Sequence, residues 1–162
     1  MARENLPNSI PLIIPTNFEY DPKTFILIER KGNHSHDKLS LVPEALLLLQ
    51  SINQPIAVLA ICGPYRSGKS HFLSQILKTT DTFKVGHTMN ACTHGVWMAT
   101  TFLQYDGFAL ILLDTEGINA VGGSASSNTR TISLLVMTTL LSSYLIYNSQ
   151  NVPTTTDLEK MG

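Results

Sequence analysis

The segment Gly63-Pro64-Tyr65-Arg66-Ser67-Gly68-Lys69-Ser70 constrains the fold of this chain more than any other feature. It has the pattern G-x-x-x-x-G-K-S, the Walker A phosphate-binding loop. The apolar run 56–62 before it is typical of a buried strand, and residues 69–78 after it are typical of a helix. The helical spacing comes from Phe72, Leu73, Ile76 and Leu77. A glycine-rich loop between a buried strand and a helix predicts a phosphate site at the helix N-terminus.

The fixed positions of this loop have separate physical roles. Gly63 and Gly68 allow the backbone to turn and to direct N–H groups at phosphate oxygens, and a side chain at Gly68 is expected to obstruct the cradle. Lys69 supplies a cation for the β and γ phosphates, and the Ser70 hydroxyl is a candidate Mg²⁺ ligand. Arg66 is unusual here. Its guanidinium either bridges the transferring phosphates, as an arginine finger supplied in cis, or points to solvent or an acid.

A second apolar run, 108–113, ends in Asp114-Thr115-Glu116-Gly117. A carboxylate at the end of a hydrophobic strand is typical of the acid that holds Mg²⁺, so Asp114 is a candidate metal ligand, with a strand-end cap as the alternative. Glu116 is a candidate for ordering water near the γ-phosphate. The Gly117 amide is a candidate γ-phosphate contact, in a loop that moves on hydrolysis.

Residues 90–97 lie between the two motifs and carry the candidate switch threonine. Thr93 precedes a Gly and an apolar segment, which favours it as the residue that senses Mg²⁺ and the γ-phosphate; Thr88 is the alternative. His94 is expected to be solvated rather than to act as a base. Trp97 is expected in the core.

The alternation of strands and helices predicts an α/β fold: a P-loop NTPase with three Ras-like layers and a mixed, mostly parallel sheet. Helices are expected at 43–52 and 127–141, and further strands at 25–28, 96–102 and 143–148. Because residues 1–17 are polar and punctuated by prolines, a flexible arm is expected there and the domain at 18–162. The uncharged run 131–147 leaves a membrane span as an alternative, although its hydroxyl side chains favour a buried helix and a strand.

The amino-acid composition excludes several classes of protein. A hydrophobic content of 43% excludes intrinsic disorder, and a net charge of −1 forces no basic face, so no nucleic-acid partner is expected. Two cysteines cannot make a disulfide scaffold, and the N-terminus has no apolar signal core. A cytoplasmic location is therefore expected, with Cys62 as a reduced core residue.

Over residues 40–150 the chain resembles the guanylate-binding protein and atlastin family of large, dynamin-related GTPases. The resemblance implies a GTP-binding domain, Mg²⁺-dependent hydrolysis to GDP and phosphate, and a homodimer across the nucleotide face. It implies Arg66 as the internal finger, Thr93 as the switch threonine and metal ligand, and Glu116 as the acid at the γ-phosphate end. The stretches that carry it are Pro43–Leu46, Ser51–Pro55, Gly63–Ser70, Thr93–Met98, Leu112–Gly117, Leu140–Ser143 and Tyr147–Ser149. The nucleotide contacts expected from it are Gly63, Tyr65, Arg66, Ser67, Gly68, Lys69, Ser70, His71 and Gly117.

Three departures from the family pattern keep alternatives open. Ala91 stands where these proteins usually have a Ser, Pro64 stiffens the loop, and no guanine-reading Arg-Asp motif precedes Gly162. We therefore expect the N-terminal portion of a GTPase domain, with membrane association through regions outside this sequence as an open point. The alternatives are a truncated or degenerate module that holds a nucleotide or a partner without turnover, and an ATP-using P-loop protein.

Overall fold

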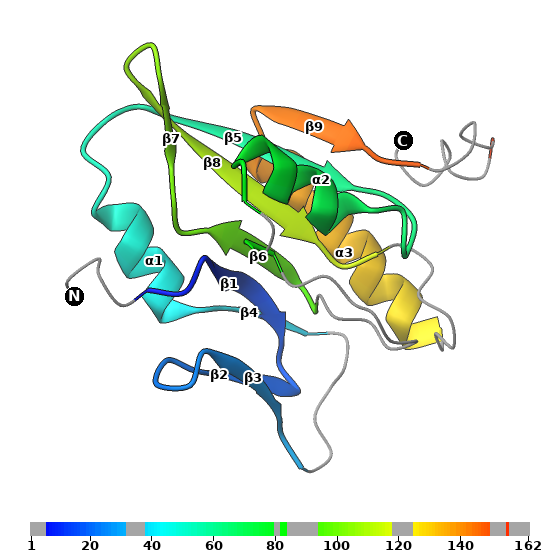
Figure 1. Ribbon diagram of the computed structural model, residues 1–162. Helices are drawn as coiled ribbons and strands as arrows, with labels where there is room; N and C mark the ends of the chain where they lie inside the picture. Colours follow the sequence, from blue (N-terminus) through cyan, green and yellow to red (C-terminus); the bar gives the residue numbers. More distant parts are fainter. Residues whose placement is uncertain are drawn as a thin grey trace.

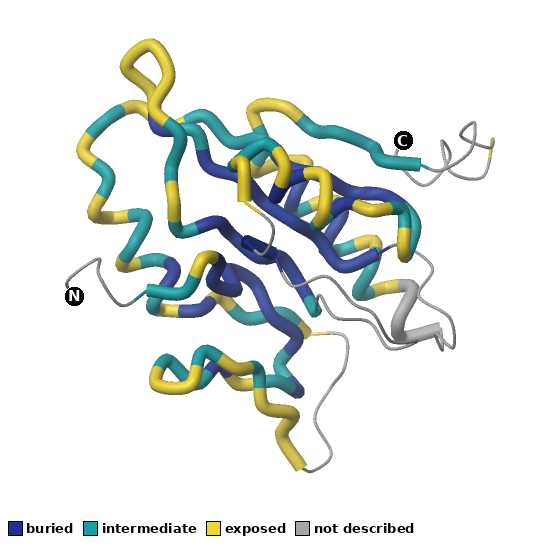
Figure 2. Tube along the Cα trace, in the orientation of Figure 1, coloured by how far each residue is buried: buried dark blue, intermediate teal, exposed yellow. Residues whose placement is uncertain are grey.

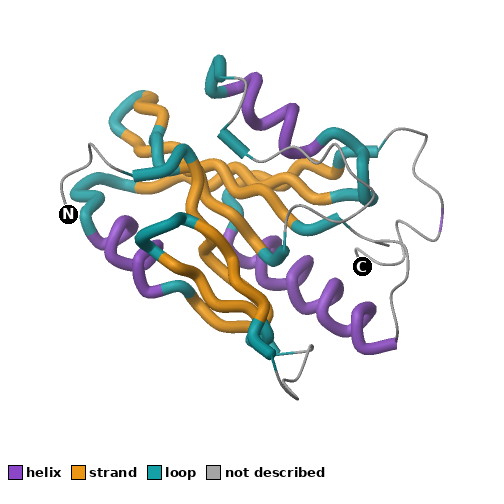
Figure 3. Tube along the Cα trace, turned by 60° about the horizontal axis from the view of Figure 1, so that its bottom comes forward, coloured by secondary structure: helices purple, strands orange, loops and turns teal. Residues whose placement is uncertain are grey.

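The computed structural model describes residues 6–31, 38–79, 82–83, 94–117, 125–149 and 155, with the backbone alone for 125–128. In these ranges the chain forms three layers (Figures 1 and 3). Helix α2 (Lys69–Ile76) covers one face of a central sheet, and α1 (Pro43–Gln50) and α3 (Ala125–Leu141) lie on the other. The predicted α/β class and layered arrangement are confirmed.

The central sheet is mixed. Strand β5 pairs in parallel with β8 and with β9, whereas the other pairs described in this sheet are antiparallel, so the expectation of a mostly parallel sheet is wrong. A separate antiparallel hairpin consists of β2 (Phe18–Asp21) and β3 (Ile26–Glu29). The strand order in the sheet is β4 (Leu39–Leu41), β1 (Ser9–Pro15), β6 (Val96–Ala99), β8 (Phe108–Thr115), β5 (Ile56–Cys62) and β9 (Tyr144–Tyr147), with β7 (Leu103–Tyr105) pairing with β8. The antiparallel pairs come from β1, β4, β6 and β7, and in β1–β4, β6–β8 and β7–β8 no helix of the described chain provides the crossover that parallel pairing needs.

The N-terminal region differs from the expectation of a flexible arm over residues 1–17. Ser9–Pro15 forms strand β1, every residue of which is buried between β4 and β6. The prolines at positions 11 and 15 argued against a strand here, because proline cannot donate a hydrogen bond to a strand ladder and is normally confined to edges or bulges. Its apolar residues, Ile10, Leu12, Ile13 and Ile14, join the main core.

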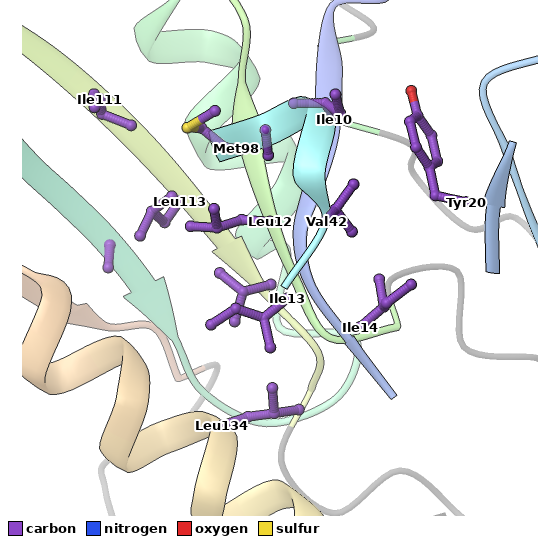
Figure 4. Close-up of a cluster of buried hydrophobic side chains, with 13 residues drawn as sticks. Ile10, Leu12, Ile13, Ile14, Tyr20, Val42, Met98, Ile111, Leu113 and Leu134 are labelled. Carbon is purple, nitrogen blue, oxygen red and sulfur yellow. The ribbon is translucent and has the colours of Figure 1, made fainter. Parts of the chain in front are cut away.

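Alternate residues of each central strand enter two separate cores, as the twofold period of a strand requires. On β8, Ile111 and Leu113 face the core under α1 and α3, and Leu112 faces the core under α2. Figure 4 shows the first core, where Leu134 of α3 meets side chains of the sheet. In Figure 2 burial is concentrated in these central strands.

Two helices are less buried than their sequences suggest. Phe72, one of the residues that gave the helical spacing of α2, is 44% exposed, and Leu47 on α1 is 63% exposed. The run 131–147 is not one helix, because α3 ends at Leu141 and strand β9 follows. Among the helices in the described ranges, none has the length and apolar character needed to cross a membrane.

Candidate functional site

Strand directions bring the two sequence motifs together at one edge of the sheet. Strands β5 and β8 run in parallel, with Ile61 beside Asp114, so the segments that follow both strands leave from the same edge. Strand β6 runs antiparallel to β8, with Val96 beside Thr115, so β6 begins where β8 ends. The phosphate loop, the segment after β8 and the residues before β6 therefore meet. This edge of an α/β sheet is where ligands usually bind.

The start of the phosphate loop is packed against the segment after β9. Gly63 has φ +143°, and a Cβ placed there would lie 2.1 Å from the Asn148 carbonyl oxygen. The Asn148 main-chain N–H donates to Cys62 O at 2.7 Å, and its side-chain amide donates to Ser67 O at 2.8 Å. Gly63 is thus required for a close backbone approach, and Asn148 fixes both ends of the loop.

The end of the loop presents open space beside a buried cation. Gly68 precedes α2 with φ +88°, and a Cβ there would meet no atom of the described residues within 4 Å. Lys69 is 6% exposed and its Nζ donates to Pro64 O at 2.8 Å. Burial lowers the pKa of Lys69, and the nearby Asp114 charge opposes this shift. An uncovered turn, a helix N-terminus and a cation suit an anion such as phosphate.

The two candidate magnesium ligands are in direct contact. Ser70 Oγ donates to Asp114 Oδ2 at 2.7 Å, and Asp114 is 1% exposed at the end of β8. A hydroxyl and a carboxylate supply the hard oxygen donors that Mg²⁺ prefers. The donor set therefore fits Mg²⁺ at the position where the motifs converge.

The other expected nucleotide-contacting residues of the loop lie nearer the surface. Arg66 is exposed with φ +61°, and its guanidinium carbon lies 5.7 Å from the centre of the Tyr65 ring. His71 is exposed in the first turn of α2. Ser67 is half-buried through its contact with Asn148. Arg66 and His71 are thus accessible to solvent.

The segment after β8 touches the phosphate loop. A Cβ on Gly117 would lie 2.5 Å from Tyr65 Cα, so only glycine permits this approach. The Glu116 side chain is 4% exposed and forms an ion pair of 2.8 Å with Arg130 of α3. Its other oxygen accepts from the Gly95 N–H at 3.2 Å. Glu116 is therefore held at the junction of three segments.

His94 differs from the expectation of a solvated side chain. Its ring stacks on Phe18 of the β2–β3 hairpin with a centroid distance of 4.6 Å, and its Nδ1 is buried. Burial lowers the pKa of His94; the Glu116 charge opposes this shift and the Arg130 charge adds to it. Trp97 is buried as predicted and donates to His94 O at 3.1 Å.

Thr93, the alternative Thr88 and the neighbouring Ala91 lie outside the described residues. Cys62, by contrast, is buried beneath the loop as a free cysteine, as predicted, and burial raises its pKa to about 11. A thiol protonated under ordinary conditions is a core residue rather than a nucleophile.

Reasoning from sequence missed two residues of this site. Asn148 carried no signal of its own, because an asparagine after a strand is common in loops. Arg130 is the one charged residue of the sequence from 118 to 149. A lone charge on an otherwise uncharged helix that packs on the sheet favours a buried partner, and this signal could have been followed to Glu116.

Comparison with known proteins agrees with this geometry. The family model of the guanylate-binding protein N-terminal domain matches residues 36–162. Guanylate-binding protein 1 of Homo sapiens is 38% identical over 117 residues, which cover 72% of this chain and 19% of that protein. Guanylate-binding protein 2 of Rattus norvegicus is 39% identical over 124 residues, covering 76% of this chain and 20% of that protein.

The chain spans about a fifth of the length of these relatives. The matched region contains both motifs, the strands that end in them and the segment after β9 that holds the phosphate loop. Since the family model covers most of the chain, this protein belongs to the guanylate-binding protein family.

Proposed function

We propose that this chain contributes the phosphate-binding part of a site that binds GTP with Mg²⁺ and hydrolyses it to GDP and phosphate. The observation that carries the proposal is the contact between Ser70 and Asp114 beside the buried Lys69. This contact joins Ser70, which follows β5 and the loop, to Asp114, which lies at the end of β8. The choice of guanine rests on the family, whose members are named for binding guanylate.

In the proposed site the loop and α2 receive the phosphates. Main-chain N–H groups around Gly68 and the ammonium of Lys69 neutralise phosphate charge, and these groups are already fixed before substrate arrives. Ser70 and Asp114 would hold Mg²⁺, and the ion would supply positive charge against the negative charge that develops in the transition state. Such preorganised charge is the main source of rate acceleration in phosphoryl transfer.

Three further residues act at the γ-phosphate end in this proposal. Arg66, which is accessible to solvent, stabilises transition-state charge as an internal finger. Glu116 orients the attacking water, and Thr93 and the Gly117 amide contact the γ-phosphate or its Mg²⁺ when the flanking loops close. Closure over the nucleotide would also create the face on which two copies associate as a homodimer.

A direct test compares nucleotide binding in the intact protein with that of the Lys69→Ala variant. Fluorescent GTP and ATP analogues are titrated with and without Mg²⁺, and phosphate release and molecular mass are followed with GTP. Lys23→Ala is the matched control, since it removes an exposed lysine from the β2–β3 hairpin. The expected result is Mg²⁺-dependent binding that prefers GTP, lost in Lys69→Ala and kept in Lys23→Ala.

Other outcomes separate the competing functions. Equal binding of GTP and ATP would contradict the assignment of guanine specificity. Tight binding without phosphate release would favour a nucleotide-holding module that does not turn over. A folded wild-type protein that binds neither nucleotide would refute the proposed function. An unchanged mass on adding GTP would refute only the nucleotide-dependent dimer.

A further inference from the structure

The Glu116 carboxylate is held by two different segments of the chain. Its Oε1 accepts a hydrogen bond from Arg130 Nη2 at 2.8 Å, and its Oε2 accepts one from the Gly95 N–H at 3.2 Å. The Glu116 main-chain N–H also donates to Gly95 O at 2.8 Å. Each carboxylate oxygen has a second lone pair, so both keep acceptor capacity for a further donor such as water.

The ion pair with Arg130 is buried. The side chains of Arg130 and Glu116 are 15% and 4% exposed. Moving two charges out of water costs roughly what their attraction returns, so a buried pair is weak evidence of stabilisation. Fixing the orientation of a carboxylate is a better physical explanation of this contact than stability.

The pair joins segments that are far apart in the sequence. Gly95 follows the segment 84–93, which contains the candidate switch threonine. Arg130 lies on α3, directly after the segment 118–124 that follows Gly117. Glu116 is therefore bonded to Gly95, directly before β6, and to Arg130 of α3.

We propose that Arg130 is a positioning residue for Glu116, which sets the carboxylate at the γ-phosphate end of the site. The role rests on the proposed function, because it assumes that Glu116 orients the attacking water. Arg130 contacts neither nucleotide nor metal in this proposal. It acts by holding the carboxylate in one orientation, since displacement of a reacting group by about 1 Å can cost roughly a hundredfold in rate.

The geometry of this contact indicates which substitutions of Arg130 keep it and which remove it. One Arg130 nitrogen reaches Glu116, and Arg130 Nε has no hydrogen-bond partner among the described residues. The pair is thus a single charge-assisted contact rather than a two-pronged one. A lysine can supply such a contact, whereas Arg130→Gln keeps a polar side chain that is shorter than arginine and carries no charge.

The experiment measures GTP turnover and affinity for a non-hydrolysable GTP analogue in the intact protein. Arg130→Gln is expected to lower kcat about tenfold to a hundredfold, as loss of an orienting partner does at other sites, with the analogue Kd within about twofold of wild type. Arg130→Lys is expected to recover most of this loss. Arg30→Gln is the matched control, because Arg30 pairs with Glu19 where both side chains are largely exposed.

A double variant tests whether Arg130 acts through Glu116. In a Glu116→Gln background, Arg130→Gln is expected to add no further loss of kcat, because the group that it positions is gone. An additive loss would overturn the proposal, as would an Arg130→Gln variant with wild-type turnover. A fall in analogue affinity and in thermal stability that matches the fall in kcat, without rescue by lysine, would show a structural role only. A wild type that does not hydrolyse GTP overturns the proposed function and this role with it. Wild-type turnover with any contrary variant result overturns this role alone.

Discussion

Replacing Gly68 by alanine tests whether the open turn before α2 is the phosphate cradle. Gly68 has φ +88°, and its Cβ would meet no described atom within 4 Å. Inside the protein the substitution therefore costs only the strain of a left-handed backbone, about 1–2 kcal/mol. If phosphate oxygens occupy the open space, the Cβ overpacks it at a further cost of about 1–3 kcal/mol. The overpacking cost affects nucleotide binding and not folding. It raises the Kd for the nucleotide by about fivefold to more than a hundredfold.

Gly107 provides the matched control for this substitution. It lies in the turn between β7 and β8 with φ +82°, and a Cβ there would also meet nothing within 4 Å. Gly107→Ala should thus cost the same 1–2 kcal/mol or so of strain, far from the phosphate loop. The two variants are expected to lose similar stability and to differ only in nucleotide affinity.

The assay combines chemical unfolding with titration of a fluorescent GTP analogue in the presence of Mg²⁺. Equal loss of stability with weakened binding only in Gly68→Ala is the expected result. Unchanged affinity in Gly68→Ala would refute the assignment of this space to phosphate. A much larger loss of stability in Gly68→Ala than in Gly107→Ala would refute the argument that strain is the only internal cost.

Three other substitutions test separate parts of the site. Ser70→Ala removes the hydroxyl that bonds Asp114, so the Mg²⁺ dependence of nucleotide affinity is expected to fall about tenfold or more, and a Mg²⁺ titration that matches wild type would contradict this. Gly117→Ala places a Cβ 2.5 Å from Tyr65 Cα and is expected to cost about 1–3 kcal/mol by forcing the two segments apart, which urea unfolding measures. Burial raises the pKa of Cys62 to about 11 from 9.0, so the folded state keeps a proton that the unfolded state loses, and stability should fall as pH rises through this window. Between about pH 8 and about pH 10.5 this loss is about 2 kcal/mol, and it should be absent in Cys62→Ala; equal slopes in both proteins would contradict the assignment.

The parts of the fold that the sequence predicts are those with strong local signals. Strands β5 and β8 are long apolar runs that end in glycine-containing motifs, and their boundaries are close to those expected. The turn at Asp106 and Gly107 was not among the expected elements, although positive φ at both residues is what an Asp-Gly pair favours in a two-residue hairpin. Ser70 and Asp114 were each predicted as Mg²⁺ ligands from their own motifs, and they come into contact because two parallel strands end at the same edge of the sheet.

Contacts between distant segments could not be predicted in this way. The burial of His94 depends on Phe18, which belongs to a separate hairpin. The short contact of Gly63 with Asn148 depends on the path of the chain after β9. Local spacing carries no information about either approach, so the sequence favoured a solvated histidine and assigned no role to the asparagine.

Strand β1 has a poor strand signal in its sequence, yet it contacts a residue that helps to hold Glu116. It tolerates prolines because its pairing is incomplete: β4 pairs only with Ile13–Pro15, and a register shift toward β6 falls between Pro11 and Ile13. At this irregularity the Ile13 carbonyl oxygen lies 2.0 Å from where a Gly95 Cβ would be. Gly95 therefore packs against β1 on one side. On the other side it forms two hydrogen bonds with Glu116. The orientation of the Glu116 carboxylate thus depends on a strand that proline content alone would have assigned to a loose arm.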